Sequence, residues 1–180
     1  MRRHFFFSGI VDSSRPFLYN IGWVEYYRSH FELAHSSWQE ALDRAPEKPA
    51  YHAVVGDAYR QLGDQALPKV HYLRALELYH GLLELSPSND EAAAELSTPL
   101  AILGECAEAE SVIDPVLSRS PESFEFMTRG AYVFTRCGSL EAAKPLALKS
   151  LSLGDVARIR FDPDLAELRE VPEVRLVLEY

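Results

Sequence analysis

The stretch Tyr19-Asn20-Ile21-Gly22 decides the fold, because Ala53-Val54-Val55-Gly56 repeats its apolar-glycine ending 34 residues later. Each stretch is followed by a helix-compatible segment, a turn and a second amphipathic segment. A self-similar period of this length is typical of repeat architectures, in which one unit buries its apolar face against the next. The pattern therefore predicts an all-α array of stacked helix-turn-helix units.

The residue types fit the packing of two helices within each unit. A small residue at Gly22 or Gly56 lets the second helix of the unit approach the first closely. Large side chains such as Trp38 and Tyr59 then fill the space between neighbours. Pro46 fits a position where the second helix has ended, because proline cannot continue a helix.

Two further units keep the same order of residue types. Ser97 replaces glycine in the third unit, and the turn glycines Gly104 and Gly138 are again 34 residues apart. From Gly63 to Gly104 the spacing is 41, so the second unit carries seven extra residues. Seven residues are close to two helical turns and return the apolar stripe to nearly the same face. We therefore expect one lengthened helix over 67–85.

Three prolines interrupt the regularity of the later units. Pro99, Pro115 and Pro145 fall inside predicted helices. A proline removes a backbone hydrogen bond and costs about 3 kcal/mol in a regular helix interior. We expect bends or local unwinding at these positions.

These patterns divide the chain into a leader (1–14), four units (about 15–48, 49–89, 90–123 and 124–155) and a C-terminal helical cap (156–180). The leader has two arginines before Phe5-Phe6-Phe7, as an export signal would, but Ser8 and Gly9 break the apolar stretch and no small-x-small cleavage site follows. We expect it to pack on the first helix, with an export signal as the alternative. In the cap, Asp162 before Pro163 predicts a helix start.

The first unit resembles the tetratricopeptide repeat family. Leu18, Ile21-Gly22, Ala34, Trp38, Ala41 and Pro46 hold the places of the family pattern W-x2-L-G-x2-Y, then A-x3-F, then P. The resemblance covers roughly residues 15–155. It implies an α-solenoid whose first helices line a concave groove that binds an extended peptide or a helix of a protein partner.

Charge and composition narrow the possible partners. Hydrophobic residues make up 47% of the chain, and the formal net charge is −9. Residues 61–125 carry three basic and twelve acidic side chains, so the whole net negative charge of the chain arises there. Nucleic acid is not expected as a partner, because phosphate binding needs clustered Lys and Arg. A basic partner is compatible with the acidic stretch, and so is an acidic face that only keeps the array soluble. No apolar run approaches the roughly 20 residues of a membrane span.

The two cysteines, Cys106 and Cys137, fall in helical segments of adjacent units. Two cysteines do not make a disulfide scaffold in a chain of this length, so we expect buried free thiols. A reducing compartment, the cytoplasm, fits that expectation.

The resemblance also indicates which side chains line the groove. The register carried over from the family places there Tyr19, Trp23, Tyr26, Tyr27, Asp57, Arg60, Glu91, Glu95, Thr98, Arg129, Tyr132 and Arg136. Aromatic side chains give large contact area at low entropic cost, so Trp23 with Tyr26 and Tyr27 is the predicted anchor, unless these rings cover the leader. The family's clamp for chaperone C-termini is absent, because Glu91 and Glu95 stand where the clamp has cations.

The sequence predicts no chemistry of its own. No phosphate-binding loop, nucleophile motif or metal-ligand spacing is present, so we expect no catalytic residue, metal or cofactor. The predicted function is a non-catalytic scaffold for protein interaction. The alternatives are a bacterial secretion-type chaperone of the same family, or an accessory subunit of an enzyme on another chain. The partner, the pathway and the oligomeric state stay open.

Overall fold

The computed structural model describes residues 14–154 and 156–179, so the leader up to residue 13 lies outside the described residues. These residues contain no strand. The helices in chain order are α1 (Ser14–Tyr27), α2 (Phe31–Arg44), α3 (Pro49–Gln61), α4 (Leu67–Leu85), α5 (Asp90–Leu103), α6 (Cys106–Arg119), α7 (Phe124–Arg136), α8 (Leu140–Ser152), α9 (Ala157–Phe161), the 3-10 turn η1 (Pro163–Leu165), α10 (Ala166–Arg169) and α11 (Pro172–Glu179).

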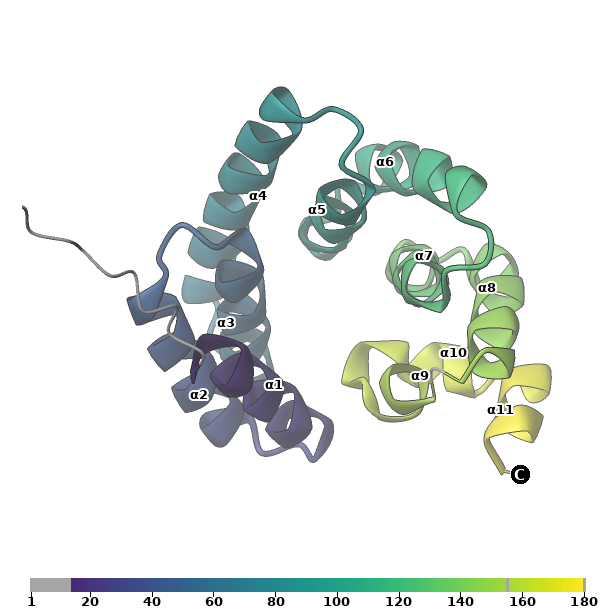
Figure 1. Cartoon of the computed structure of the whole chain (residues 1–180). Coiled ribbons are helices and arrows are strands. Elements are labelled where there is room, and N and C mark those ends of the chain that lie inside the picture. Colours follow the sequence, from purple (N-terminus) through teal and green to yellow (C-terminus); the bar gives the residue numbers. More distant parts are fainter. Residues whose placement is uncertain (1–13, 155, 180) are drawn as a thin grey trace, which may run out of the picture.

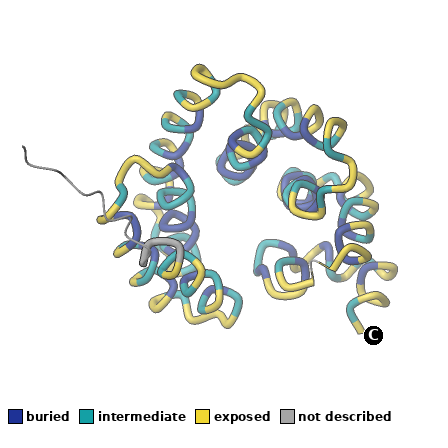
Figure 2. The backbone as a smooth tube through the Cα atoms, in the orientation of Figure 1, coloured by how far each residue is buried: buried dark blue, intermediate teal, exposed yellow. Residues whose placement is uncertain are grey.

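The helices stack into a curved array. Within each pair α1–α2, α3–α4, α5–α6 and α7–α8 the helices pack together, and each second helix packs on the first helix of the next pair. Figure 1 shows α5 and α7 on the inside of the curve, with α6 and α8 on the outside, and α5 contacts α7 directly. Burial is densest along these inner helices (Figure 2). The architecture is an α-solenoid, as the repeat predicts.

Glycines allow the close approach inside the first two pairs. A Cβ atom at Gly22 would lie 2.0 Å from Nε1 of Trp38, and one at Gly56 would lie 2.9 Å from the Tyr72 ring. Trp38 is fully buried, and its indole N–H donates to the Tyr19 carbonyl at 3.0 Å. The predicted role of the two glycines is confirmed, because any side chain there would displace the aromatic ring that fills the pair.

The lengthened second unit is confirmed as well. Helix α4 covers Leu67–Leu85 and has 19 residues, five more than α2 or α6. The other two extra residues lie in the turn between α3 and α4. Helices α5, α6 and α8 continue through their internal prolines without a break, so the expected unwinding does not occur. The turn glycines have positive φ angles, the conformation that glycine accommodates best: Gly63 83°, Gly104 86° and Gly138 77°.

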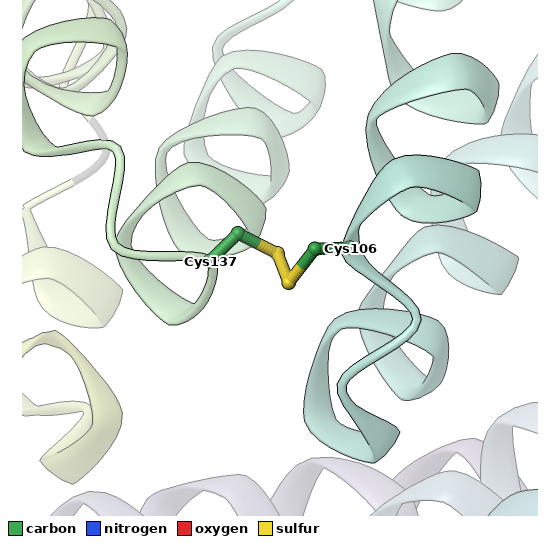
Figure 3. The surroundings of a disulfide bond; sticks show 2 residues. All are labelled: Cys106 and Cys137. Carbon is green, nitrogen blue, oxygen red and sulfur yellow. A yellow bond between two sulfur atoms is a disulfide. The ribbon is translucent and has the colours of Figure 1, made fainter.

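The expectation of free thiols is wrong. Cys106 at the start of α6 and Cys137 at the C-terminal end of α7 form a disulfide bond (Figure 3), with their Cα atoms 5.6 Å apart. The stacking of the third pair on the fourth brings the two residues together across 31 positions of sequence. Because the cytoplasmic location rested on reduced cysteines, it stays a prediction without that support.

The C-terminal segment covers the end of the array, as expected. Four apolar side chains of this segment are fully buried in one cluster with the inward residues of α8: Ile159, Leu165, Leu168 and Val174. Asp162 caps η1 by accepting the Asp164 amide hydrogen at 3.0 Å, which confirms its predicted capping role.

The same segment also reaches the first half of the chain, which the sequence did not predict. Helix α9 contacts α1, and Asp164 of η1 pairs with Arg60 of α3. The curved array therefore closes on itself, and the C-terminal segment meets the two first pairs across the concave surface (Figure 1).

Candidate functional site

Three neighbouring cavities are lined by side chains from the first helices of the pairs, α1, α3, α5 and α7. The outer cavity, of about 350 Å³, is lined by Tyr19, Lys48, Pro49, Ala50, Tyr51, Tyr79, Leu82, Asn89, Glu91, Ala92 and Glu95. The central cavity, of about 30 Å³, is lined by Tyr19, Trp23, Ala50, Ala53, Val54, Asp57, Tyr79, Glu95, Thr98, Arg129 and Arg158. The cap cavity, of about 270 Å³, is lined by Tyr19, Trp23, Tyr27, Glu125, Thr128, Arg129, Ala157 and Arg158.

The three cavities share walls and so form one candidate site. Tyr19 lines all three, Glu95 separates the outer cavity from the central one, and Trp23, Arg129 and Arg158 separate the central cavity from the cap cavity. Helices α1, α3, α5, α7 and α9 each contribute a side chain to the central cavity. The site is therefore composite, built by four repeats and the C-terminal segment together.

The outer cavity combines aromatic rings with carboxylates. Tyr19 and Tyr51 pack with ring centroids 5.4 Å apart, and the buried Tyr79 hydroxyl donates to Glu95 at 2.9 Å. Burial and the charge of Glu95 raise the pKa of Tyr79, so it stays a neutral donor. Glu91 is exposed at the rim and makes no ion pair among the described side chains. An aromatic wall beside a carboxylate favours a cationic group.

Glu95 is the charged group at the boundary of the outer and central cavities. Its carboxylate accepts a hydrogen bond from Nη2 of Arg129 at 3.0 Å, in addition to the bond from Tyr79. Arg129 also lies 3.6 Å from Glu125, one turn earlier on α7. These contacts fix the boundary between the cavities, because both partners of the main ion pair are largely buried.

The closing seam, defined here as Asp164 with its partners, lies beside the central cavity. Arg60 donates both terminal nitrogens to Asp164, at 2.8 and 2.5 Å, and the Tyr132 hydroxyl donates at 2.7 Å. Arg136 lies 3.8 Å away. Burial alone would raise the pKa of Asp164, but Arg60 and Tyr132 hold that pKa below its ordinary value. Asp164 is thus a buried carboxylate whose lost hydration is replaced by hydrogen bonds from Arg60 and Tyr132.

Asp57 joins the seam to the core of the second pair. The Tyr72 hydroxyl donates to Asp57 at 2.7 Å, and Arg60 lies 3.6 Å away while also donating to the Tyr72 oxygen at 3.2 Å. Burial raises the pKa of Asp57 to about 6, although Arg60 and Tyr72 favour its ionised form. The seam is therefore flanked by a carboxyl group, that of Asp57, whose pKa lies well above its ordinary value.

Arg158 of α9 is the second contact between the C-terminal segment and the first repeat. Its guanidinium lies 5.9 Å from the Trp23 ring and 5.0 Å from the Tyr132 ring, and its Nε lies 3.5 Å from Asp162. An arginine held against aromatic faces is stabilised by cation–π attraction, which is stronger when the group is desolvated. Arg158 thereby closes one wall of the central and cap cavities.

The predicted groove residues fall into three locations. Tyr19, Trp23, Tyr27, Asp57, Glu91, Glu95, Thr98 and Arg129 line the cavities, whereas Arg60, Tyr132 and Arg136 hold the closing seam. Tyr26 does neither: only 2% of it is exposed, it packs on Trp38 in the core, and its hydroxyl accepts a hydrogen bond from Gln61 at 3.2 Å. Its placement on the groove surface was wrong, because Trp23 covers it.

Sequence reasoning missed the residues that other segments bring to the site. Tyr51 and Tyr79 line the outer cavity, and Arg158 with Asp164 come from the C-terminal segment. Tyr51 carried a usable signal, since it lies on the first turn of α3, next to the predicted groove face. Asp164 and Arg158 carried none, because Asp164 pairs with Arg60, 104 positions away in sequence, and Arg158 packs on Trp23 of the first helix.

Two further features concern all of the described residues. No helix there has both the length and the apolar character of a membrane span. No three His, Cys, Asp or Glu side chains of residues 14–154 and 156–179 are grouped so that they could hold a metal ion.

The stacked pairs and the glycine–aromatic packing define this chain as an α-solenoid built from helical repeats. A family model described as tetratricopeptide repeat matches residues 19–67. The fold is similar to TTC0263, a thermophilic TPR protein of Thermus thermophilus, with 20% identity, 86% of this chain and 81% of that chain covered, and a TM-score of 0.52. Residues 19–67 thus match the tetratricopeptide repeat family, and the described chain as a whole has the α-solenoid fold of stacked helical repeats.

A second solved structure is also similar. MamA (41-end) from Desulfovibrio magneticus RS-1 is 19% identical over 93% of this chain and 90% of that one, with a TM-score of 0.47. The search among curated proteins found no match.

Proposed function

We propose that the protein is a non-catalytic interaction module that binds a segment of a protein partner in the composite site. The fold supports this proposal, because stacked helical repeats present extended concave surfaces for binding. The observation that carries it is the set of three adjoining cavities: Tyr19 lines all three, Glu95 lines the outer and central ones, and Arg129 lines the central and cap ones.

The lining of the outer cavity favours a basic side chain in the bound segment. Its tyrosines offer ring faces, Glu91 is exposed without an ion pair among the described side chains, and Glu95 lies deeper. Lys48 at the rim is the only cation among its described lining residues. A lysine or arginine side chain of the partner fits this cavity, through cation–π contact with Tyr19 and Tyr51 and attraction to Glu91.

The test is a panel of fluorescent peptides that differ only in one central residue: lysine, arginine, glutamine or glutamate. The basic peptides should bind best, and the double variant Glu91→Gln/Tyr51→Leu should weaken them about fivefold, since an exposed charge pair and one cation–π contact together contribute about 1 kcal/mol. Glu108→Gln, on the exposed face of α6, is the matched control. Equal binding of all four peptides, or no effect of the double variant, would contradict the proposal.

A further inference from the structure

The central cavity concentrates unpartnered polar atoms. Among the described residues, four buried side-chain polar atoms lack a hydrogen-bond partner: Nε2 of His35, Oγ1 of Thr98, Nε of Arg129 and Nε of Arg158. The last three belong to residues that line the central cavity. An unpaired buried donor costs about 1–3 kcal/mol, so three at one place indicate a site that receives a hydrogen-bonding group.

The charges around the cavity show which kind of group fits. Arg129 is paired with Glu95 at 3.0 Å, and Arg158 is paired with Asp162 at 3.5 Å. Each guanidinium therefore already has its counter-charge. Nε of Arg129 lies outside its ion pair, and Nε of Arg158 faces Oδ2 of Asp162 at 3.5 Å, yet neither Nε–H makes a hydrogen bond. A further carboxylate would meet Glu95 and Asp57, which also line the cavity. A neutral oxygen acceptor satisfies both N–H groups without that repulsion.

The volume of the central cavity also favours a small neutral acceptor. Its volume of about 30 Å³ holds one small polar group. The cap cavity beside it, of about 270 Å³ and walled by Trp23 and Tyr27, has room for an adjoining side chain. A backbone carbonyl, with its side chain in the cap cavity, matches both volumes.

The site is complete only when the array is closed. Thr98 and Arg129 come from α5 and α7, whereas Arg158 comes from α9. Helix α9 contacts α1 and is followed by η1, which the closing seam holds to α3 and α7, because Arg60 and Tyr132 donate to Asp164. None of the three seam residues lines the central cavity. They are therefore positioning residues, which place Arg158 without touching the bound group.

We propose that the central cavity binds a backbone carbonyl of the partner segment, through Nε–H of Arg129, Nε–H of Arg158 and the Thr98 hydroxyl, and that closure of the seam assembles this site. The inference rests on the proposed function, which it extends by assigning a main-chain contact beside the outer cavity.

The experiment uses the full chain and follows the arginine Nε–H signals by ¹H–¹⁵N NMR. The probes are N-acetyl-lysine N-methylamide, which carries amide carbonyls and an ammonium group, and n-butylamine, which carries only the ammonium group. Arg129→Lys and Arg158→Lys assign the two signals. Both signals should shift saturably with the amide probe and stay in place with n-butylamine.

The seam variants test assembly. Asp164→Asn should weaken binding of the amide probe about tenfold, the loss expected when Arg158 no longer reaches the acceptor. Tyr132→Phe removes a single hydrogen bond to Asp164, keeps a ring beneath Arg158, and should give a smaller loss if Asp164→Asn fails to fold. Asp43→Asn, exposed on α2, is the control and should bind like the unmodified chain.

Two results would overturn the inference. If the Nε–H signals show only cross-relaxation with water and no probe shift, the cavity holds water alone. If the seam variants bind the amide probe as tightly as the unmodified chain, closure does not assemble the site. Loss of the central contact, with basic peptides still sensitive to Glu91→Gln/Tyr51→Leu, would leave the proposed function intact.

Discussion

The joints between helices within the first two pairs and the seam that closes the array are built from opposite kinds of contact. Inside those pairs, a buried aromatic ring fits over a glycine, as Trp38 does at Gly22 and Tyr72 does at Gly56. At the seam, Asp164 is surrounded by Arg60, Tyr132 and Arg136. The joints depend on shape, and the seam depends on charge and hydrogen bonds.

Stability and assembly therefore depend on different contacts in this molecule. Apolar burial is non-directional and large in sum, so the joints contribute to the folding free energy through buried apolar area. A buried ion pair contributes less net stability but requires its own particular partners. The joints should therefore respond to changes of volume, and the seam to changes of charge and pH.

The largest expected effect is at a joint. Gly22→Ala should lower the free energy of unfolding by about 4 kcal/mol, because the new methyl group would force the buried Trp38 indole out of its place. Gly81→Ala in α4 is the matched control, since a Cβ there has no neighbour within 4 Å, and it should raise stability by up to about 1 kcal/mol. Urea denaturation measures both, and similar results for the two variants would refute the role of Gly22.

The second largest effect is expected at the disulfide bond. Reduction of the Cys106–Cys137 bond should lower the free energy of unfolding by about 3 kcal/mol, because the bond closes a loop with a sequence separation of 31. Denaturation with and without a reductant measures this loss. The double variant Cys106→Ser/Cys137→Ser should match the reduced chain and ignore the reductant. A reductant effect that persists in the double variant would contradict this origin.

At the seam, Asp164→Asn should cost about 2 kcal/mol, since three donors lose a charged acceptor that burial had isolated from water. Asp43→Asn on the exposed face of α2 should change stability by less than about 0.5 kcal/mol. Thermal unfolding with small-angle scattering compares the two. An unchanged radius of gyration together with unchanged stability in Asp164→Asn would show that the seam does not close the array.

The smallest effect is the pH dependence at Asp57. Its pKa of about 6 lies above the ordinary 3.8, because of its burial, so between those values the folded chain holds a proton that the unfolded chain has lost. Stability from this group therefore falls as the pH rises from about 4 to 6, on the order of 1 kcal/mol relative to Asp57→Asn. Denaturation curves at several pH values give the difference, and a gain of stability with rising pH would reverse the assignment.

The joints could be predicted from the sequence, and the seam could not. The 34-residue spacing, the glycine positions and the helix over 67–85 all follow from local rules of helix packing. Those rules describe neighbours in the chain. Arg60 and Asp164 meet only because of the overall curvature of four stacked pairs. No local sequence pattern predicts that overall curvature.

The candidate site shows the same division. Tyr19, Glu91 and Glu95 followed from the repeat register, whereas Arg158 arrived from the C-terminal segment. Tyr26 was misplaced because a register assigns a helix face but does not show that Trp23 packs over that face. The disulfide was missed for a related reason: Cys106 and Cys137 become neighbours through stacking rather than through spacing.

The extra length of α4 has a consequence for how such a site can be adjusted. Leu82, on the part of α4 near its end, lines the outer cavity, although α4 is the second helix of its pair. An insertion of seven residues keeps the following units in phase, as the later 34-residue spacing shows. An insertion of this length can therefore extend the wall of the outer cavity while the other units keep their packing.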